Sequence, residues 1–307
     1  MTTEFHRTVD LNQVRRRLGR VGVWSAALGA LPAGQEREQL QHIEELGYSA
    51  VWLTEMEKEA FAHSALALAA TKTITVATGI ANMWAREPET AASGANALGE
   101  AFEGRFVLGV GISHARFVER YQKPLAKARE YLGRMHDAQL LGTPAPAPTP
   151  WLVAALRTKM LELSASQAQG AHPYFVPPEH TALARKIIGP DAILAPELAV
   201  VLDPNPETAR ATARGYMTLY LALPNYTNNL LELGFTDDDF ASGGSDRLVD
   251  AVIAWGDVEA IKRRVDDHLA AGADHVCIQP LTDTDRYPGG RFPTHELVEL
   301  APALLRS

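Results

Sequence analysis

Short apolar runs recur along the chain, and segments with helical spacing of apolar positions separate most of them. We predict eight strands from these runs, at residues 21–24, 50–54, 73–82, 105–111, 151–156, 170–176, 198–203 and 275–281. Because the runs are nearly continuous rather than alternating, their strands should be buried on both faces, as in a parallel sheet covered by helices. Eight such strands predict an α/β fold, a (β/α)8 TIM barrel. A doubly wound open sheet is the alternative, and the absence of a Rossmann fingerprint favours the barrel.

Three of the intervening helices are marked by proline and glycine. Residues 35–46 end before Gly47, residues 89–102 lie between Pro88 and Gly104, and residues 257–271 end before Gly272. Proline at the first helical position and glycine just past the last one are typical of helix boundaries. The order of helix, glycine and strand in these segments therefore supports the crossovers that a parallel barrel needs.

Two segments depart from the alternation. Residues 143–150 (TPAPAPTP) should form a stiff connector into the fifth strand, too short to separate domains. About seventy residues lie between the seventh and eighth strands, far more than one helix needs. We predict a helical insertion there, at the mouth of the barrel, where such insertions are often functional. We expect residues 1–307 to form a single domain.

Composition and charge restrict the class of partner. The net charge is −8, from 29 basic and 37 acidic residues, and we interpret the basic cluster Arg15–Arg16–Arg17 near the N-terminus as a solvated end. We therefore expect no nucleic-acid partner. No stretch approaches the roughly 20 apolar residues of a membrane span. The single cysteine, Cys277, lies in an apolar run and should be a buried small hydrophobe, which suits a reducing cytoplasm. The first ten residues, MTTEFHRTVD, lack the layout of a signal peptide, so we expect a cytoplasmic protein.

In an α/β barrel the active site lies at the carboxyl ends of the strands. The polar and aromatic residues expected there are Trp24, Ser25, Thr54, Glu55, His63, Gly79, Asn82, Trp84, Arg86, Ser113, His114, His172, Tyr174 and Gln279. Some of them have structural alternatives. Trp24 could pack in the core, His63 lies on a helical pattern, and Arg86 could pair with Glu87 or cap a turn.

Several kinds of catalysis have little support. The chain has no His-Glu-x-x-His motif, no cysteine pair, and no Gly-x-Ser-x-Gly elbow, so metal and serine-nucleophile sites are not predicted. Residues 109–113 (GVGIS) begin like a dinucleotide loop but lack the third glycine. They do leave backbone N–H groups that a phosphate or a flavin edge could approach closely.

Two segments carry a family resemblance. RFVLGVGIS (105–113) and TGIANMWAREP (78–88) resemble the luciferase-like superfamily of flavin and deazaflavin barrels. Segments further along, such as QGAHPYFVPPEHTALARKIIGP, LPNYTNNLLELGFTD, GGSDRLVDAVIAWGD and AGADHVCIQPL, resemble an actinobacterial branch described as F420-dependent oxidoreductases. The resemblance extends over nearly the whole chain. One departure is Glu87, which stands where the family has histidine.

The resemblance implies a set of site residues. A cis peptide that forms a bulge behind the cofactor ring would be Gly79–Ile80. The proton that accompanies hydride transfer would come from Glu55 or His114. The residues implied to bind the cofactor are Gly79, Ile80, Asn82, Gly111, Ser113, Ala171 and His172. Trp24 and Trp84 would border the substrate. Residues 170–173 (GAHP) stand where we match the family's Gly-Gly-Pro phosphate turn.

The resemblance also implies an activity, with alternatives. It implies hydride transfer between the deazaflavin F420 and a small organic substrate, by a homodimer. An FMN-dependent monooxygenase of the same fold, fed by a separate flavin or F420 reductase, is the first alternative. A barrel that only binds a ligand or partner is the second. A metal-free lyase or aldolase is weaker, because no predicted strand ends in the lysine that such an enzyme would use.

Overall fold

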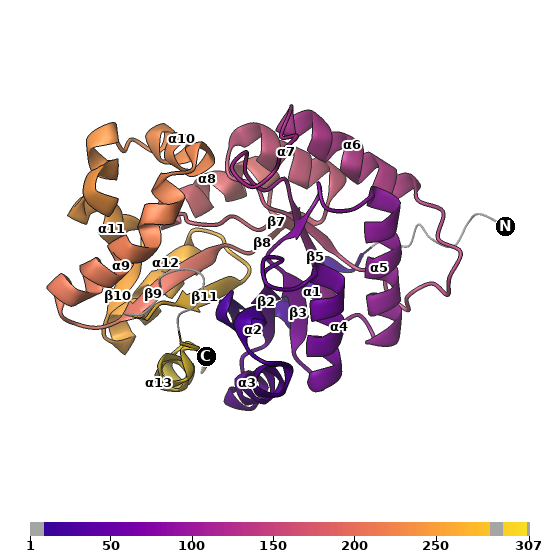
Figure 1. Ribbon diagram of the computed structural model, residues 1–307, viewed down its shortest axis with the longest axis horizontal. Coiled ribbons are helices and arrows are strands. Elements are labelled where there is room, and N and C mark those ends of the chain that lie inside the picture. Colours follow the sequence, from indigo (N-terminus) through magenta and orange to yellow (C-terminus); the bar gives the residue numbers. More distant parts are fainter. Residues whose placement is uncertain (1–8, 283–290, 306–307) are drawn as a thin grey trace.

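The computed structural model describes residues 9–282 and 291–305, and every pairing between its described strands is parallel (Figure 1). The strands are β1 (Val21–Ser25), β2 (Ala50–Leu53), β3 (Thr75–Thr78), β4 (Ala81–Asn82), β5 (Phe106–Gly111), β6 (Trp151–Val153), β7 (Gly170–Ala171), β8 (Ile193–Leu194), β9 (Glu197–Leu202), β10 (Ala254–Gly256) and β11 (Val276–Pro280). Their order is β10-β9-β11-β1-β2-β3-β5-β6-β7-β8, with β4 paired to β5. Residues 1–8, on which the expectation about a signal peptide partly rests, lie outside the described residues.

The sheet closes into a barrel because β8 and β9 are two halves of one strand, interrupted at Ala195 and Pro196. The Ala195 N–H donates to the Ala171 carbonyl on one side, at 3.0 Å, and the Pro196 carbonyl accepts from the Cys277 N–H on the other, at 3.1 Å. Backbone hydrogen bonds therefore join β7 through this strand to β11, which pairs with β1. The predicted TIM barrel is confirmed.

Each of the eight predicted runs contains a strand of the barrel. The run at residues 73–82 is divided into β3 and β4, with Gly79 and Ile80 between them. The structure adds β8 and β10, which the sequence did not predict. These strands have two and three residues, so pairing with a neighbour defines them rather than any local apolar pattern.

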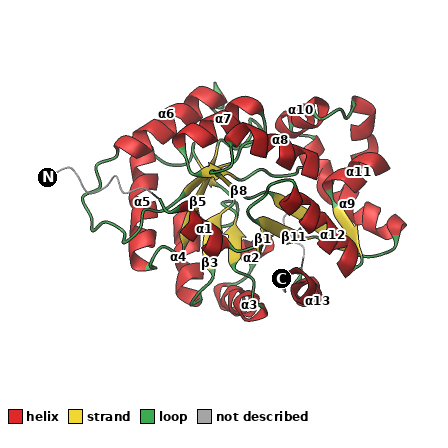
Figure 2. Cartoon of the chain, turned by 180° about the vertical axis from the view of Figure 1, so that it is seen from behind, coloured by secondary structure: helices red, strands yellow, loops and turns green. Residues whose placement is uncertain are grey.

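Helices surround the barrel (Figure 2). They are α1 (Leu11–Leu18), α2 (Ala27–Ala30), α3 (Ala33–Leu46), α4 (Ala60–Ala70), α5 (Pro88–Ala101), α6 (Pro124–Asp137), α7 (Thr158–Gln167), α8 (Pro178–Ile188), α9 (Pro206–Leu221), α10 (Pro224–Glu232), α11 (Asp246–Val252), α12 (Val258–Ala270), α13 (Thr294–Leu304) and the 3₁₀ helix η1 (Asp237–Gly243). The three helices predicted from proline and glycine are α3, α5 and α12, each found within two residues of its predicted ends. None of the described helices is long and apolar enough to cross a membrane.

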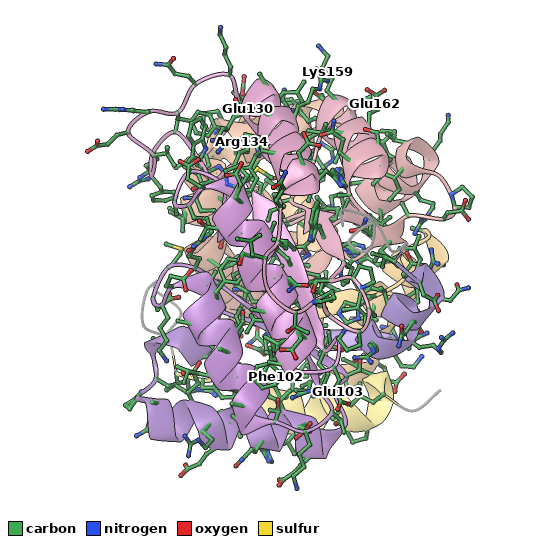
Figure 3. The ribbon with its side chains drawn as sticks, turned by 90° about the vertical axis from the view of Figure 1, so that its right-hand side faces the viewer. Phe102, Glu103, Glu130, Arg134, Lys159 and Glu162 are labelled. Carbon is green, nitrogen blue, oxygen red and sulfur yellow. The ribbon has the colours of Figure 1, made fainter. Side chains whose placement is uncertain are left out.

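Arginine side chains hold some of the outer helices together. Arg134 of α6 bonds Glu89 of α5 at 2.8 Å and Glu87, just before α5, at the same distance. Figure 3 shows Arg134 on this face beside Glu130, with Phe102 and Glu103 further along, beyond the end of α5. Such exposed pairs contribute little stability, so this surface is solvated charge rather than a site.

The predicted helical insertion is confirmed between β9 and β11. Helices α9, α10 and α11 with η1 form a separate lobe in Figure 1, coloured orange. The lobe has its own apolar cluster, which includes Met217, Leu230 and Leu248 and extends to Phe175 after β7 and Val201 of β9. The lobe is therefore fastened to the barrel by apolar burial, close to the carboxyl ends of the strands.

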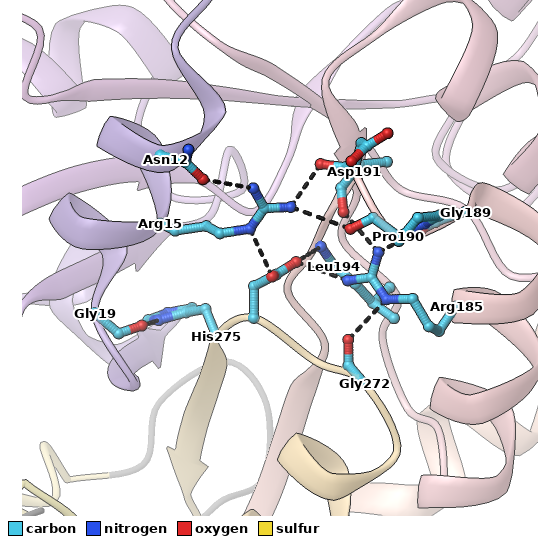
Figure 4. Close-up of polar contacts among 12 residues, drawn as sticks. Asn12, Arg15, Gly19, Arg185, Gly189, Pro190, Asp191, Leu194, Gly272 and His275 are labelled. Atoms are coloured by element: carbon cyan, nitrogen blue, oxygen red, sulfur yellow. Dashed lines mark hydrogen bonds and ion pairs between the residues drawn. The ribbon is translucent and has the colours of Figure 1, made fainter.

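The amino-terminal end of the barrel is closed by α1 and a polar network. Leu18 of α1 belongs to the same buried cluster as Trp52 and Cys277, so the cysteine is buried as predicted. Asp274 accepts from Arg15 at 2.8 Å and from Arg185 at 2.7 Å. Figure 4 shows both arginines reaching carbonyl groups as well, of residues 189–191 and 272. Arg15 is thus part of a structural network, and not the solvated end that the sequence suggested.

Candidate active site

A cavity of about 210 Å³ opens at the carboxyl ends of the strands. Its lining residues come from the strand ends and from the insertion, and they are Trp24, Thr54, Glu55, Met56, Gly79, Ile80, Asn82, Gly111, Ile112, Ser113, His114, Phe117, Ala154, Ala155, Leu156, His172, Tyr174, Leu219, Tyr220, Leu223, Asn225 and Tyr226. Nine of the eleven residues predicted for the site line this cavity, and Trp84 and Ala171 do not.

The end of strand β3 forms one wall. The Gly79–Ile80 peptide bond is cis, as the resemblance implies. Glycine is needed at this position because a Cβ on Gly79 would lie 2.5 Å from Trp24 Nε1. Gly111 has a similar role in the neighbouring strand, where a Cβ would lie 2.9 Å from Ile80 Cγ1. Two glycines therefore let two strands and an indole ring meet closely behind the cavity.

Glu55 is held by the segment that follows β3. Its carboxylate forms a salt bridge with Arg86 and accepts from the Asn82 N–H at 2.6 Å. Arg86 also bonds Glu59 at 3.0 Å, whereas Glu87 pairs with Arg134. Arg86 therefore does not pair with Glu87, and it joins the ends of β2 and β4. Because the Glu55 carboxyl already accepts from Arg86 and from the Asn82 N–H, these contacts favour a positioning role for Glu55.

His114 stands on the opposite wall, in the loop after β5. Its ring centroid lies 5.1 Å from that of Tyr226 and 6.2 Å from that of Phe117. Burial lowers the pKa of His114 from its usual range, which keeps the imidazole neutral at pH 7. The preceding residue, Ser113, has φ of 53°, a conformation that side chains seldom adopt. A neutral imidazole at the cavity wall can both accept and donate a proton.

His172 and Trp24 form the floor. The His172 ring stacks on Trp52 with centroids 4.2 Å apart, and its Nδ1 lies 2.6 Å from the Ala195 carbonyl oxygen. Burial lowers the pKa of His172 to about 4, so it is neutral. Its Nε2 and Trp24 Nε1 are buried and have no hydrogen-bond partner among the described residues. The floor therefore presents polar atoms that the protein leaves unpaired.

A cluster of tyrosines closes the side of the cavity next to the insertion. The Tyr174 hydroxyl donates to Gln279 Oε1 at 2.7 Å and lies 2.8 Å from the hydroxyls of Tyr216 and Tyr220. Burial raises the pKa of all three phenols, so they remain neutral hydrogen-bonding groups. Tyr216, Tyr220 and Tyr226 were missed by sequence reasoning. The spacing of four residues between Tyr216 and Tyr220, which places both on one face of α9, was the available signal.

Glu197 is a buried carboxyl beside these tyrosines that the sequence analysis also missed. Its Oε2 accepts from the Phe175 N–H at 3.1 Å, and its Oε1 has no partner among the described residues. Burial raises its pKa to about 8, so the group is a neutral acid at pH 7. A charged residue inside the apolar run ILAPELAVVL was the available signal.

Six of the candidate residues do not line the cavity, namely Ser25, His63, Trp84, Arg86, Ala171 and Gln279. The Trp84 indole donates to the Ile112 carbonyl at 2.8 Å, and its ring faces Tyr121 at 5.9 Å. Trp84 therefore fastens the loop after β5 rather than lining the cavity. Ala171 is buried in β7, between Val153 and Leu194. His63 contacts Glu36 behind the cavity. The described residues contain no cluster of His, Cys, Asp or Glu suited to a metal ion.

The cavity fits a planar, largely neutral ring better than a compact ion. Its walls carry indole, phenol and aliphatic groups, and no lysine or arginine occurs among the described lining residues. The unpaired Trp24 Nε1 and His172 Nε2 are polar atoms at the floor that such a ring could reach. The residues 170–173 matched to a phosphate turn are buried and carry no positive charge. They are therefore a poor place for a phosphate.

Comparisons with known proteins agree with this fold. The family model of luciferase-like monooxygenases matches residues 18–275, and the chain belongs to this family. A protein of Mycobacterium tuberculosis that carries the provisional name of a coenzyme F420-dependent oxidoreductase is 30% identical over 118 residues. That match covers 36% of this chain and 33% of the relative.

Two solved structures have the same fold. One is an F420-dependent secondary alcohol dehydrogenase in complex with an F420-acetone adduct, with a TM-score of 0.71 and 15% identity over 93% of this chain and 98% of that one. The other is the oxygenating constituent of 3,6-diketocamphane monooxygenase from Pseudomonas putida in complex with FMN, with a TM-score of 0.64 and 15% identity over the same shares. Identities this low show the fold alone.

Proposed function

We propose that the chain transfers a hydride between F420 and a small, uncharged organic substrate. The observation that carries this proposal is the meeting of Gly79, Ile80, His114, His172 and Trp24 around one cavity at the carboxyl ends of the strands. The local likeness to a named F420-dependent relative favours the deazaflavin over other redox groups. When bound, F420 supplies hydride chemistry at its C5 with little reactivity toward oxygen.

Each wall of the cavity has a part in this proposal. Ile80 and Gly111 provide a flat backing against which a tricyclic ring can lie. The Glu55–Arg86 salt bridge fixes the strand ends on either side of that backing, through the Asn82 N–H. The anionic part of the cofactor would lie toward the start of α7, where Arg157 and Lys159 follow the lining residue Leu156 and the free backbone N–H groups of a helix end favour negative charge.

The proton that accompanies hydride transfer is assigned to His114. It is neutral, it borders the cavity, and its ring lies against aromatic neighbours that exclude water. Glu55, the other candidate, is engaged by Arg86 and Asn82. The apolar side chains of Leu219, Leu223 and Phe117 complete the wall. They favour an uncharged substrate, because a charged one would lose its hydration there without a countercharge.

The test is titration of the purified protein with F420 and, separately, with FMN, following the fluorescence of each cofactor. We expect micromolar binding of F420 and weaker binding of FMN. Binding of FMN alone would instead support the second candidate, an FMN-dependent monooxygenase served by a separate reductase, which the lack of basic residues in the cavity lining leaves open. Binding of neither would contradict both and favour a barrel that only binds a ligand or a partner.

We also propose that the chain works as a homodimer in the cytoplasm. Light scattering after size-exclusion chromatography measures the first point directly. A mass of about 33 kDa, that of one chain, would contradict it.

A further inference from the structure

Two polar atoms at the floor of the cavity lack partners. Trp24 is 6% exposed and His172 is 1% exposed, yet Trp24 Nε1 and His172 Nε2 make no hydrogen bond within the described chain. Leaving a buried polar group unpaired destabilises a fold, because the group loses its hydrogen bonds to water and gains none. Both residues line the cavity, so a bound molecule is in a position to pair with them.

The two atoms have opposite hydrogen-bonding character. An indole N–H can only donate. His172 Nδ1 faces the Ala195 carbonyl oxygen at 2.6 Å, and since that oxygen can only accept, the proton is on Nδ1. Burial lowers the pKa of the ring to about 4, so no second proton is present at neutral pH. His172 Nε2 is therefore a bare acceptor next to the Trp24 donor.

The donor and the acceptor meet at one place, beside the cis peptide. A Cβ built on Gly79 would lie 2.5 Å from Trp24 Nε1 and 3.3 Å from His172 Nε2. The Gly79–Ile80 bond at that place is the surface that we propose as the backing of the cofactor ring. A carboxylate or phosphate would fit poorly, because its oxygens only accept and one of them would face the Nε2 lone pair.

We propose that Trp24 and His172 bind the lactam edge of the cofactor ring, in which a carbonyl oxygen stands next to an N–H. The carbonyl accepts from the indole, and the N–H donates to the imidazole. This inference rests on the proposed function, but not on the choice of cofactor, because F420 and FMN share the lactam. The pair thus recognises the class of ring, and other parts of the site distinguish the two cofactors.

Two substitutions remove one hydrogen-bonding atom each. Trp24→Phe removes the indole N–H and keeps an aromatic ring. His172→Asn removes Nε2, while the asparagine amide can still donate to the Ala195 carbonyl as Nδ1 does. Trp255→Phe is the matched control, since its indole donates to Asp250 at 2.8 Å, outside the cavity. Circular dichroism and thermal melting establish that each variant is folded before binding is measured.

The experiment measures binding by cofactor fluorescence and the indole N–H by ¹⁵N NMR. We expect Trp24→Phe and His172→Asn each to raise the dissociation constant of the cofactor by roughly threefold to tenfold, with no change in Trp255→Phe. We also expect the indole resonance that is missing in Trp24→Phe to move downfield when cofactor is added to the unaltered protein.

The contrary outcomes separate the two proposals. Unchanged affinity in both floor variants, with a stationary Trp24 resonance, overturns the lactam assignment while the proposed function stands. The Trp24 indole resonance could also stay unchanged with cofactor and move only when 2-propanol or cyclohexanol is added. That result would assign Trp24 and His172 to a substrate hydroxyl, and it would overturn the lactam assignment too. If neither F420 nor FMN binds and neither alcohol moves the resonance, both proposals fail.

Discussion

The two ends of the barrel treat buried polar groups in opposite ways. At the amino-terminal end, both oxygens of Asp274 are taken by Arg15 and Arg185, and Asp274 also accepts from the Leu194 N–H at 2.8 Å. At the carboxyl end, Trp24, His172 and Glu197 each keep a buried polar atom without a partner among the described residues. Buried polar groups in native proteins are almost always paired. Gln167, His180 and His268 also keep such an atom, but only Trp24 and His172 line the cavity as well, which indicates that the carboxyl end binds something.

The largest effect should come from the cavity wall. His114→Ala removes the group that we assign to proton transfer, and positioned general acids and bases typically contribute about 10²- to 10⁴-fold in rate. We expect kcat to fall by that order while the cofactor dissociation constant changes little. Stopped-flow absorbance of the cofactor measures both. Unchanged turnover would remove His114 from the mechanism, and His136→Ala, at an exposed histidine outside the cavity, is the control.

A substitution at the amino-terminal end of the barrel should lower stability and leave cofactor binding unchanged. Asp274→Ala leaves Arg15 and Arg185 largely buried without their carboxylate, and we expect a loss of about 2–4 kcal/mol in the free energy of unfolding. Cofactor affinity should stay the same, because Asp274 is not among the residues that line the cavity. Urea denaturation gives the stability. Asp266→Ala, in a more exposed pair with Arg20, is the control and should cost less than 1 kcal/mol or so. Equal losses in the two variants would contradict the contrast drawn above.

The smallest effect concerns Glu197, and it depends on pH. Its pKa is raised to about 8 by burial, so the folded chain holds this proton while the unfolded chain releases it above about pH 4.5. Stability should therefore decrease as pH rises from about 4.5 to 8, and Glu197→Gln should remove that decrease. We expect the variant to gain on the order of 2 kcal/mol relative to the unaltered protein between pH 5 and pH 6.5, at about 1.4 kcal/mol per pH unit.

Denaturant unfolding at the two pH values measures this effect, with Glu179→Gln, an exposed residue, as the control. Three buried histidines act in the opposite sense. Burial lowers the pKa of His172 and His275 to about 4 and that of His268 to about 3, so stability is also lost as pH falls below about 6.5. The unaltered protein and Glu197→Gln both contain these histidines, so the difference between their pH dependences reports on Glu197 alone. A variant that follows the pH dependence of the unaltered protein would show that Glu197 is ionised in the fold.

The sequence predicted most of the barrel because its strands and helices are specified locally. Continuous apolar runs, Pro88 and the terminal Gly47 and Gly272 mark elements that the structure contains. Nearly all the predicted site residues also meet, because the carboxyl ends of parallel strands share one edge. Trp84 and Ala171 are the exceptions. The Trp84 indole donates to the Ile112 carbonyl instead of lining the cavity, and no pattern in the sequence predicts this contact.

The remaining features depend on contacts between distant segments. Tyr220 and Tyr226 reach the cavity only because the insertion folds back over the strand ends. The Glu55–Arg86 pair joins residues 31 positions apart, so local reasoning could only leave open whether Arg86 pairs with its neighbour Glu87, caps a turn or serves the site. Such pairings are set by tertiary geometry, which a single sequence does not contain.

The interruption of the barrel strand at Ala195 and Pro196 links closure of the sheet to the chemistry of the floor. The Ala195 carbonyl is directed to the His172 side chain, at the point where proline has no N–H to offer the ladder. The same oxygen determines which ring nitrogen of His172 carries the proton. A shift of the backbone at Ala195 and Pro196 would therefore change which nitrogen of His172 is protonated. It would thus change which ligand groups His172 can bind, without any substitution among the residues that line the cavity.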